Sequence, residues 1–332
     1  MGVKPSPFDN RGASALGSEG REAKGAKPTW VVGAPVAPES RIGSVIEREY
    51  HVRSILSQGE LGTTYQVFNT RLKSYFNVLF LDRQLAPTHE MMLAVRADLA
   101  RARDMQALGL MPIRLVTDDL GVPGFATERL DGESLRQRVG RAPMPVAAAL
   151  ALMLHLSKAL AAGHQAGLIH GDLRPENVFL VRPGAKGPYA GRVMVLEHSL
   201  RHLRRRPPGF DDSLPLGKLR YRPPEQVAGL VLSADQGGDI FVLGALLYEL
   251  CAGHPPHNFD QLEDISRAAR ETDVRPLSTL VPTVNRRLAG MIDRCLRREP
   301  GERYPTAELL QLELEGLAAE LAVPTAQTVI KQ

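Results

Sequence analysis

The chain has 332 residues, of which 43% are hydrophobic and 23% are charged, and its formal net charge is +4. This length suits two lobes better than one core, and there is no lysine-rich run or interleaving of bases with aromatic residues that would point to nucleic-acid binding. The two cysteines, Cys251 and Cys295, lie in apolar helical stretches, which favours reduced core thiols over a disulfide.

Residues 1–46 are rich in glycine, proline, alanine and serine and lack a hydrophobic period, so we predict a disordered leader. From residue 47 to about residue 85, short runs of β-forming residues alternate with turn residues and predict strands. Residues 89–109 have apolar side chains at three- and four-residue spacing, which predicts a helix ending at Gly109. Two more strand-like runs complete a small antiparallel sheet carrying one helix, over residues 47–130.

After residue 130 the pattern becomes mostly helical, with loops that contain proline and glycine. We expect the larger lobe over residues 131–318 and a flexible tail over 319–332. The predicted helices of this lobe are 145–163, 238–252, 260–271, 285–298 and 305–321. The fold class is therefore α+β, with a small β-rich lobe joined to a larger helical lobe across a cleft.

Two apolar stretches are candidates for a membrane span. The run Ile240–Gly253 is shorter than the ~20 residues that a span needs, and it contains Glu249. The run Val146–Gly163 is interrupted by His155 and Lys158. With no apolar signal region at the start of the sequence, we expect a cytoplasmic protein without a membrane span.

Six motifs follow one another between residues 48 and 318. They are LSQGELGTTY, FATERLDGESL, HGDLRPEN, YRPPEQ, DIFVLGALLYELCAGHPPH and REPGERYPTAELL. In this order they resemble the glycine-rich loop, hinge, catalytic loop, activation-segment end, central helix and closing helix of a bacterial Ser/Thr protein kinase of the eukaryotic type. The resemblance implies a two-lobed protein-kinase fold.

The catalytic loop is the strongest of these motifs. The resemblance implies that Asp172 would accept the proton of a substrate hydroxyl and that Asn177 would hold magnesium. Arg174 stands where the family has a lysine that neutralises the transferred phosphoryl group, and a guanidinium can supply the same charge. Gly171 replaces the usual arginine that grips a phosphorylated activation segment. The alternative is that Asp172 and Asn177 only hydrogen-bond their own loop.

The nucleotide-binding positions are altered. Gly59 and Gly62 would let the backbone approach phosphates, although two glycines also suit an ordinary hairpin turn. Thr64 and Asn77 replace the usual small apolar ceiling, and Phe179 would form a bulky floor, which favours a pocket closed by side chains. The positions that match the family's nucleotide site are Gly59, Gly62, Leu79, Thr127, Glu128, Leu130 and Phe179.

An ion pair of the small lobe is also changed. Leu79 stands where the resemblance places a phosphate-gripping lysine, and Lys73 is expected in a hairpin turn facing water. Counting back from the next strand places Ala102 at the position of the partner glutamate, with Asp98 and Asp104 off register. The lysine and the glutamate are expected to be lost together, because a buried carboxylate without its cation would destabilise the fold.

The metal-binding triplet Asp-Phe-Gly is replaced by Glu-His-Ser at residues 197–199. Asn177 and Glu197 are the candidate metal ligands, but glutamate is one methylene longer and magnesium tolerates misplaced ligands poorly. A solvated loop carboxylate is the alternative for Glu197. Ser199 removes the glycine that lets the segment swing. Lys218 replaces a threonine that bonds to the catalytic aspartate, and it could pair with that aspartate instead.

Positions that hold the fold together are retained. The resemblance implies that Glu225 and Arg303 form a buried ion pair, that Asp239 anchors the catalytic-loop backbone, and that His170 is structural.

Loss of one preorganised charge contact costs about 3–4 kcal/mol in a transition state. Several simultaneous losses would therefore reduce phosphoryl transfer to a negligible rate.

We therefore predict a pseudokinase without a cofactor that acts as a binding, regulatory or scaffold module in Ser/Thr phosphorylation signalling. Its partner would be another protein: an active kinase, a substrate or a phosphopeptide reader. The first alternative is a weakly active Ser/Thr kinase that uses ATP and Mg²⁺ with atypical nucleotide contacts. The second is a small-molecule phosphotransferase, which also uses His-Gly-Asp, although the PPE and GHPP segments argue against it.

Overall fold

The structure, a computed structural model, describes residues 37–85, 87–204, 216–227, 234–261, 264, 267–268, 271–323 and 326. The chain divides into two compact units. The smaller unit comprises the chain up to Leu99 together with Pro112–Leu130 and His202–Arg204, and the larger unit comprises the rest. The two are described separately below.

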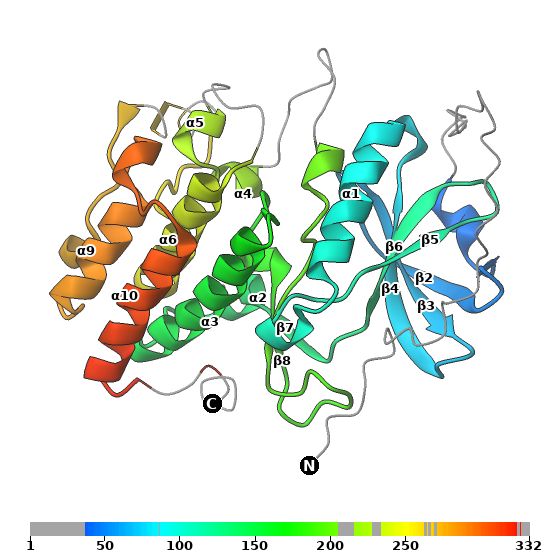
Figure 1. Cartoon of the computed structure of the whole chain (residues 1–332), viewed down its shortest axis with the longest axis horizontal. Helices are drawn as coiled ribbons and strands as arrows, with labels where there is room; N and C mark the ends of the chain where they lie inside the picture. Colours follow the sequence, from blue (N-terminus) through cyan, green and yellow to red (C-terminus); the bar gives the residue numbers. More distant parts are fainter. Residues whose placement is uncertain are drawn as a thin grey trace. The chain divides into compact units, whose positions relative to one another are not determined.

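The smaller unit is built on an antiparallel sheet with strand order β1-β2-β3-β4-β6-β5 (Figure 1). Its elements are β1 (Val45–Ile46), β2 (Tyr50–Gly59), β3 (Gly62–Asn69), β4 (Ser74–Leu81), α1 (His89–Ala102), β5 (Arg114–Thr117) and β6 (Pro123–Glu128). Alternate residues of β4, namely Phe76, Val78 and Phe80, are buried, as a half-buried strand requires. The predicted sheet with one helix is confirmed, although the helix ends at Ala102 and a separate 3-10 turn, Gln106–Leu108, precedes Gly109.

The predicted leader was too long. Residues 37–46 form a 3-10 helix, Pro38–Arg41, and strand β1. The buried Arg41 pairs with Asp118 at 2.9 Å, and the Tyr65 hydroxyl donates to the Pro38 carbonyl at 2.9 Å. A short segment held by an ion pair, a hydrogen bond and the pairing of β1 with β2 shows no hydrophobic period, which explains the error. Residues 1–36 lie outside the described residues.

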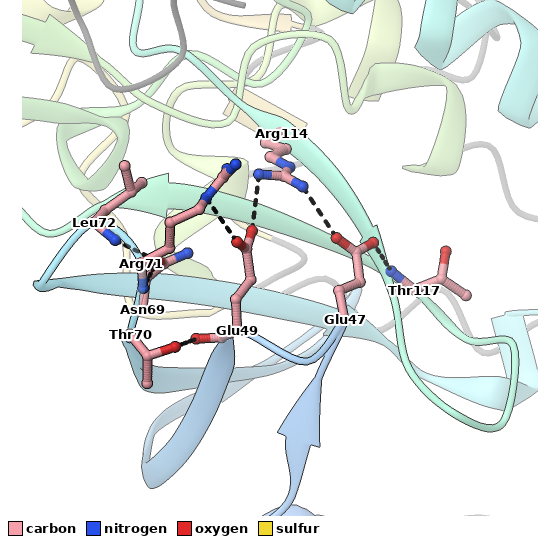
Figure 2. A network of polar contacts seen from close by, with 8 residues as sticks. All are labelled: Glu47, Glu49, Asn69, Thr70, Arg71, Leu72, Arg114 and Thr117. Carbon is pink, nitrogen blue, oxygen red and sulfur yellow. Dashed lines mark hydrogen bonds and ion pairs between the residues drawn. The ribbon is translucent and has the colours of Figure 1, made fainter. Parts of the chain in front are cut away.

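A network of polar side chains lies at the turn between β1 and β2 (Figure 2). Glu47 accepts a hydrogen bond from the Thr117 amide at 3.1 Å and pairs with Arg114 at 3.2 Å. Glu49 pairs with Arg114 and with Arg71, each at 3.0 Å. Because Arg114 and Thr117 belong to edge strand β5, these contacts join the two edges of the sheet, β1 and β5. These contacts hold the β1–β2 turn against strand β5.

The larger unit is mostly helical and carries a three-stranded antiparallel sheet, β7-β8-β9. Its strands are β7 (Gly132–Ser134), β8 (Val178–Val181) and β9 (Val193–Val195). Its helices are α2 (Leu135–Val139), α3 (Val146–Gln165), α4 (Leu216–Leu219), α5 (Pro224–Val227), α6 (Gln236–Ala252), α8 (Leu277–Leu280), α9 (Arg286–Cys295) and α10 (Ala307–Glu320). Helix α6 is the centre of the core, because it packs against both α3 and α9.

Most predicted helices of this unit appear within a few residues of their expected ends. Only scattered residues of the predicted helix 260–271 are described. The tail was predicted to be flexible from residue 319, but α10 continues to Glu320. Side-chain caps explain several helix starts: Asp235 accepts from the Gly238 amide, Asn285 from the Leu288 amide, and Thr306 from the Leu309 amide.

In the described part of the chain, α3 is long and apolar enough to cross a membrane by length and composition alone. A buried core helix passes the same test, and α3 packs against α6 and α10. Its two polar interruptions have partners, since Lys158 pairs with Glu315 at 2.9 Å and the His155 ring bonds to the Val193 carbonyl at 3.2 Å.

Candidate functional site

The backbone of the loop that contains Asp172 is anchored by Asp239, a buried residue in the first turns of α6. Its carboxylate accepts hydrogen bonds from the His170 amide, the Gly171 amide and the His164 ring, each at 2.9 Å. Burial alone would raise the pKa of Asp239, but the bonds from His164 and Gly171 hold that pKa below its ordinary value of 3.8. The sequence analysis missed His164, which lies on α3 and is one of the few polar residues on that helix.

A ring of hydrogen bonds fixes Asp172 within the loop. The His170 ring accepts from the Asp172 amide at 3.3 Å through Nδ1, so its Nε2–H donates to the Leu196 carbonyl at 3.0 Å. The Leu196 amide donates to the Asn177 carbonyl at 2.7 Å, and the Asn177 side chain donates to the Asp172 carbonyl at 2.9 Å. Asn177 therefore does bond its own loop, through its nitrogen, and a carboxamide carries its oxygen on the opposite side.

Gly171 is dictated by local geometry. Its φ is +70°, in the left-handed region that disfavours side chains. A Cβ at this position would lie 2.5 Å from the Cβ of Ala234 and 3.2 Å from that of Arg201. The arginine that the family usually carries has no room here, because the Ala234 side chain takes the space of its first carbon and Arg201 crowds the same place.

Arg174 lies between the two acidic residues expected to carry the chemistry. Its Nε is 3.3 Å from Asp172 Oδ2, and its terminal nitrogen is 3.7 Å from Glu197 Oε2. Both contacts are ion pairs rather than well-directed hydrogen bonds, at side chains that are only partly exposed. The structure thus brings Asp172, Arg174 and Glu197 together, with one cation shared by the candidate proton acceptor and the candidate metal ligand.

The donor set at Glu197 does not fit a resident magnesium ion. Magnesium requires near-ideal octahedral oxygen geometry, whereas Glu197 already faces a guanidinium. Among the residues that the structure describes, there is also no group of three or more His, Cys, Asp and Glu side chains that could hold a metal.

The segment around Glu197 is held in an unusual backbone conformation. Glu197 and Ser199 have φ of +56° and +71°, which costs non-glycine residues roughly 1–2 kcal/mol each. The buried His198 stabilises the turn, because its Nε2 bonds to the Met111 carbonyl at 2.6 Å and its Nδ1 bonds to the Ser199 hydroxyl at 2.8 Å. Ser199 therefore keeps the left-handed conformation that a glycine would suit, and its side chain helps to fix it. The sequence analysis gave His198 no role.

Leu79 lies on the face of the small sheet that carries the other altered nucleotide positions. It pairs with Thr64 on β3 and with Phe125 on β6, and Asn77 pairs with Thr127. Directly paired residues, and residues two apart on one strand, share a face of a sheet. At the position of the family's lysine this chain therefore has an apolar side chain, Leu79, whose neighbours are partly or fully buried. Lys73 lies exposed in the β3–β4 turn, as predicted.

Two buried polar atoms of this sheet lack a hydrogen-bond partner in the described residues. Asn77 Oδ1 belongs to the Leu79 face, whereas Glu128, which carries the other atom, Oε2, pairs with Phe76 on the opposite face. Burial raises the pKa of Glu128. Leu130, another expected nucleotide contact, is the last residue of the Pro112–Leu130 segment of the smaller unit. Phe179 belongs to the larger unit, on β8 opposite Ser134 and Met194.

The two glycines of the β2–β3 hairpin have a structural explanation. Gly59 pairs with Gly62 across a two-residue turn, Glu60-Leu61. A Cβ on Gly62 would lie 2.0 Å from the Phe80 carbonyl oxygen, and the φ of Gly62 is +146°. The close approach of β4 therefore requires Gly62 without any ligand, as the hairpin alternative predicted for a turn with two glycines.

Asp98 is the buried acid of helix α1, and its register relative to the family's glutamate stays a prediction. Its side chain is fully buried and lies 3.0 Å from the His202 ring. Ala102 is the last residue of α1, and Asp104 is exposed. The 3-10 turn Gln106–Leu108 lies between α1 and strand β5.

Three further expected positions lie in the larger unit. Glu225 of α5 and Arg303 form a buried ion pair at 2.7 Å. Lys218 lies in the short helix α4 and is partly buried. Its expected pairing with Asp172 stays a prediction.

Comparisons with known proteins agree with this architecture. The family described as protein kinase domain matches residues 50–314. The Ser/Thr-protein kinase PknL of Mycobacterium tuberculosis is 26% identical over 282 residues, which cover 85% of this chain and 68% of PknL. Pkn1 of Myxococcus xanthus, another Ser/Thr-protein kinase, is 28% identical over 269 residues, or 80% of this chain and 38% of Pkn1.

Solved structures show the same fold. The PknI kinase domain of Mycobacterium tuberculosis superposes with a TM-score of 0.61, at 22% identity, over 83% of this chain and 98% of that domain. A β-sheet lobe with one helix and a larger helical lobe are the two parts of the protein-kinase fold. The chain belongs to the protein kinase domain family.

Proposed function

We propose that this chain is a pseudokinase of the Ser/Thr type, which acts by binding and regulating another protein in phosphorylation signalling. The observation that carries the proposal is Leu79. Leu79 pairs with Thr64 and Phe125 in the sheet, and it is an apolar side chain at the position where the family resemblance implies a phosphate-gripping lysine. Lys73, the only lysine between residues 47 and 130, lies in a turn.

The larger unit supports the same proposal. Arg174 is shared between Asp172 and Glu197, so the charge that would meet a transferred phosphoryl group is already engaged within the loop. Meanwhile Asp239 and the Glu225–Arg303 pair keep the loop and the helices in place. The residues that hold the fold are paired, whereas those that would grip a nucleotide are replaced. The expected partner is an active kinase, a kinase substrate or a phosphopeptide reader in the cytoplasm, and not nucleic acid.

One observation favours a second candidate, a weakly active Ser/Thr kinase that uses ATP and Mg²⁺. Asp172 and Asn177 keep a fixed relation through the Asn177 side chain and the His170 ring. A proton acceptor held in this way could act on a hydroxyl if another cation replaced the missing lysine.

The two candidates are separated by transfer of radiolabelled phosphate from ATP. The purified chain and its Asp172→Ala variant are incubated with ATP, with and without magnesium, and with a generic protein substrate. The pseudokinase predicts equal and background-level labelling for both. Labelling that disappears in Asp172→Ala would overturn it in favour of the weak kinase.

The regulatory role is tested with an active Ser/Thr kinase from the same cell as the probe. Its rate of substrate phosphorylation is measured with and without this chain. We expect a change of at least severalfold that is the same for the wild type and Asp172→Ala. If no kinase of the cell responds and none phosphorylates or binds the chain, the regulatory role is wrong.

A further inference from the structure

Helix α10 carries an apolar stripe on its outer face, in addition to the face that packs in the core of the larger unit. Leu309 and Leu312 are 45% and 54% exposed, and the exposed Gly316 and Ala319 continue the same line toward the end of the helix. Residues at three- and four-residue spacing share one face of a helix. We call these four residues the α10 stripe. Single exposed leucines are common, but a stripe that runs for about three helical turns is typical of a contact surface.

Ion pairs with neighbouring helices border the stripe on both sides, from α9 on one side and from α3 on the other; Figure 1 shows α9 and α10 next to each other. The pairs are Arg287–Glu320 at 3.1 Å, Arg294–Glu313 at 3.8 Å and Lys158–Glu315 at 2.9 Å. Three of the four glutamates of α10 therefore have a cation from another helix. An apolar centre with a polar rim is the usual anatomy of a protein–protein interface. Because the rim is mostly neutralised within the chain, a second surface of the same kind can approach without strong repulsion.

The order of residues in the stripe fits a second copy of the same stripe. Its members are separated by three, four and three positions, so the intervals are the same when the helix is read in either direction. In an antiparallel pair related by a two-fold axis, Leu309 of one copy lies opposite Ala319 of the other, and Leu312 lies opposite Gly316. Each large side chain then meets a small residue, which lets the ridges of one helix fit the grooves of the other.

We propose that the α10 stripe is the contact surface of a homodimer in which the α10 helices of two copies pack antiparallel. The stripe is confined to one helix, so the interface is small and the dimer is weak and reversible, with a Kd of roughly 10–500 µM. A strongly charged partner fits the stripe less well, because the charges of the rim are already paired. The inference goes beyond the proposed function and does not depend on whether the chain transfers phosphate.

The dimer is tested by sedimentation equilibrium of the full chain at concentrations up to about 1 mM. Leu312→Glu places a charge in the centre of the stripe and leaves the core intact, because Leu312 is exposed. The matched control is Leu93→Glu, which changes a leucine that is 52% exposed on α1. We expect the Kd to rise at least about tenfold in Leu312→Glu and to stay within about twofold of the wild type in the control.

Two results of this experiment would overturn the dimer. One is a wild-type chain that stays monomeric over the whole range of concentrations, which would leave the stripe as a surface for a different protein. The other is a Leu312→Glu variant that dimerises as well as Leu93→Glu does, because the dimer would then use another surface.

The antiparallel arrangement is tested by disulfide formation between two single-cysteine variants. Chains with Leu312→Cys and chains with Gly316→Cys are mixed and oxidised, and the native cysteines do not interfere because both are buried. The two new thiols face each other in the proposed dimer, within the short Cα–Cα range that a disulfide needs. The mixed disulfide should form faster than it does when Glu308→Cys, another exposed position of α10, replaces Gly316→Cys. Equal rates in the two mixtures would contradict the proposal.

Discussion

Arg303 uses all five of its N–H groups, and two of them hold Glu225. The two bonds to the Glu225 carboxylate are 2.8 and 2.7 Å long, and the other three N–H groups donate to the carbonyls of Arg297, Gly237 and Arg298. A buried arginine is stable only when its donors are satisfied in this way. The pair therefore ties helix α5 to the start of α6 and to the loop after α9.

The first prediction concerns this pair. Arg303→Lys should lower the free energy of unfolding by about 3–5 kcal/mol, because a lysine leaves the buried Glu225 with an imperfect partner. Urea unfolding followed by circular dichroism measures the change. Arg287→Ala is the matched control, because its pair with Glu320 is about half exposed and should contribute less than about 1 kcal/mol. Equal losses in the two variants would show that the buried pair has no special role.

The second prediction is a dependence on pH. Hydrogen bonds hold the pKa of Asp239 below its ordinary value of 3.8. A carboxyl group whose pKa is lower in the folded state stabilises the fold above its unfolded pKa, and this stabilisation is lost as the pH falls through that value toward the folded pKa. Unfolding measured from about pH 6 to about pH 3 should therefore show a steeper loss in the wild type than in Asp239→Asn. Parallel curves would contradict this assignment.

The third prediction concerns Gly171. Gly171→Ala should destabilise the protein by at least about 1–3 kcal/mol, because the left-handed backbone and the 2.5 Å approach of Ala234 both oppose a side chain. Gly290→Ala is the control, since a Cβ on that helical glycine meets nothing within 4 Å. The control should raise stability by roughly 0.5–1 kcal/mol. Thermal unfolding of both variants measures these opposite shifts, and a stable Gly171→Ala variant would refute the steric argument.

The fourth prediction concerns the segment before β2. The reference is a chain shortened to begin at residue 37. A chain that begins at residue 50 loses Arg41, Glu47 and Glu49, so Asp118 is left buried without its cation and the Thr117 amide without its acceptor. We expect a loss of about 3–5 kcal/mol for this second chain, measured by urea unfolding. Equal stability of the two would show that the segment only lies on the surface.

The fifth prediction concerns the thiols. Cys251 and Cys295 are free and buried, and burial raises the pKa of each to about 12. Since the thiolate is the reactive form, neither should react with a thiol reagent at about pH 8 until the protein unfolds. Reaction of the native protein on a timescale of minutes would contradict the packing around α6 and α9.

The sequence predicted the lobes well because their motifs carry strong local constraints. The helices of the larger unit follow from apolar spacing and capping residues such as Asp235, and the small sheet follows from alternation such as that of Phe76, Val78 and Phe80. These patterns depend on neighbours within one helix or strand, so a single sequence is enough to find them.

What the sequence did not predict depends on contacts between distant residues. Arg41 finds Asp118 across 77 positions, and His202 finds Asp98 across 104, so no local pattern signals either pair. At Gly62 the family resemblance suggested a contact with phosphate. The close approach of the Phe80 carbonyl already explains why a glycine is needed at this position.

The position of helix α3 in the sequence has a consequence for how this protein folds during its synthesis on the ribosome. Helix α3 packs against α10, which is synthesised about 140 residues later. Until α10 emerges, the nascent chain exposes apolar residues of α3 that chaperones would recognise. Truncation before α10 should therefore give an insoluble product, even though every motif of the catalytic loop is already present.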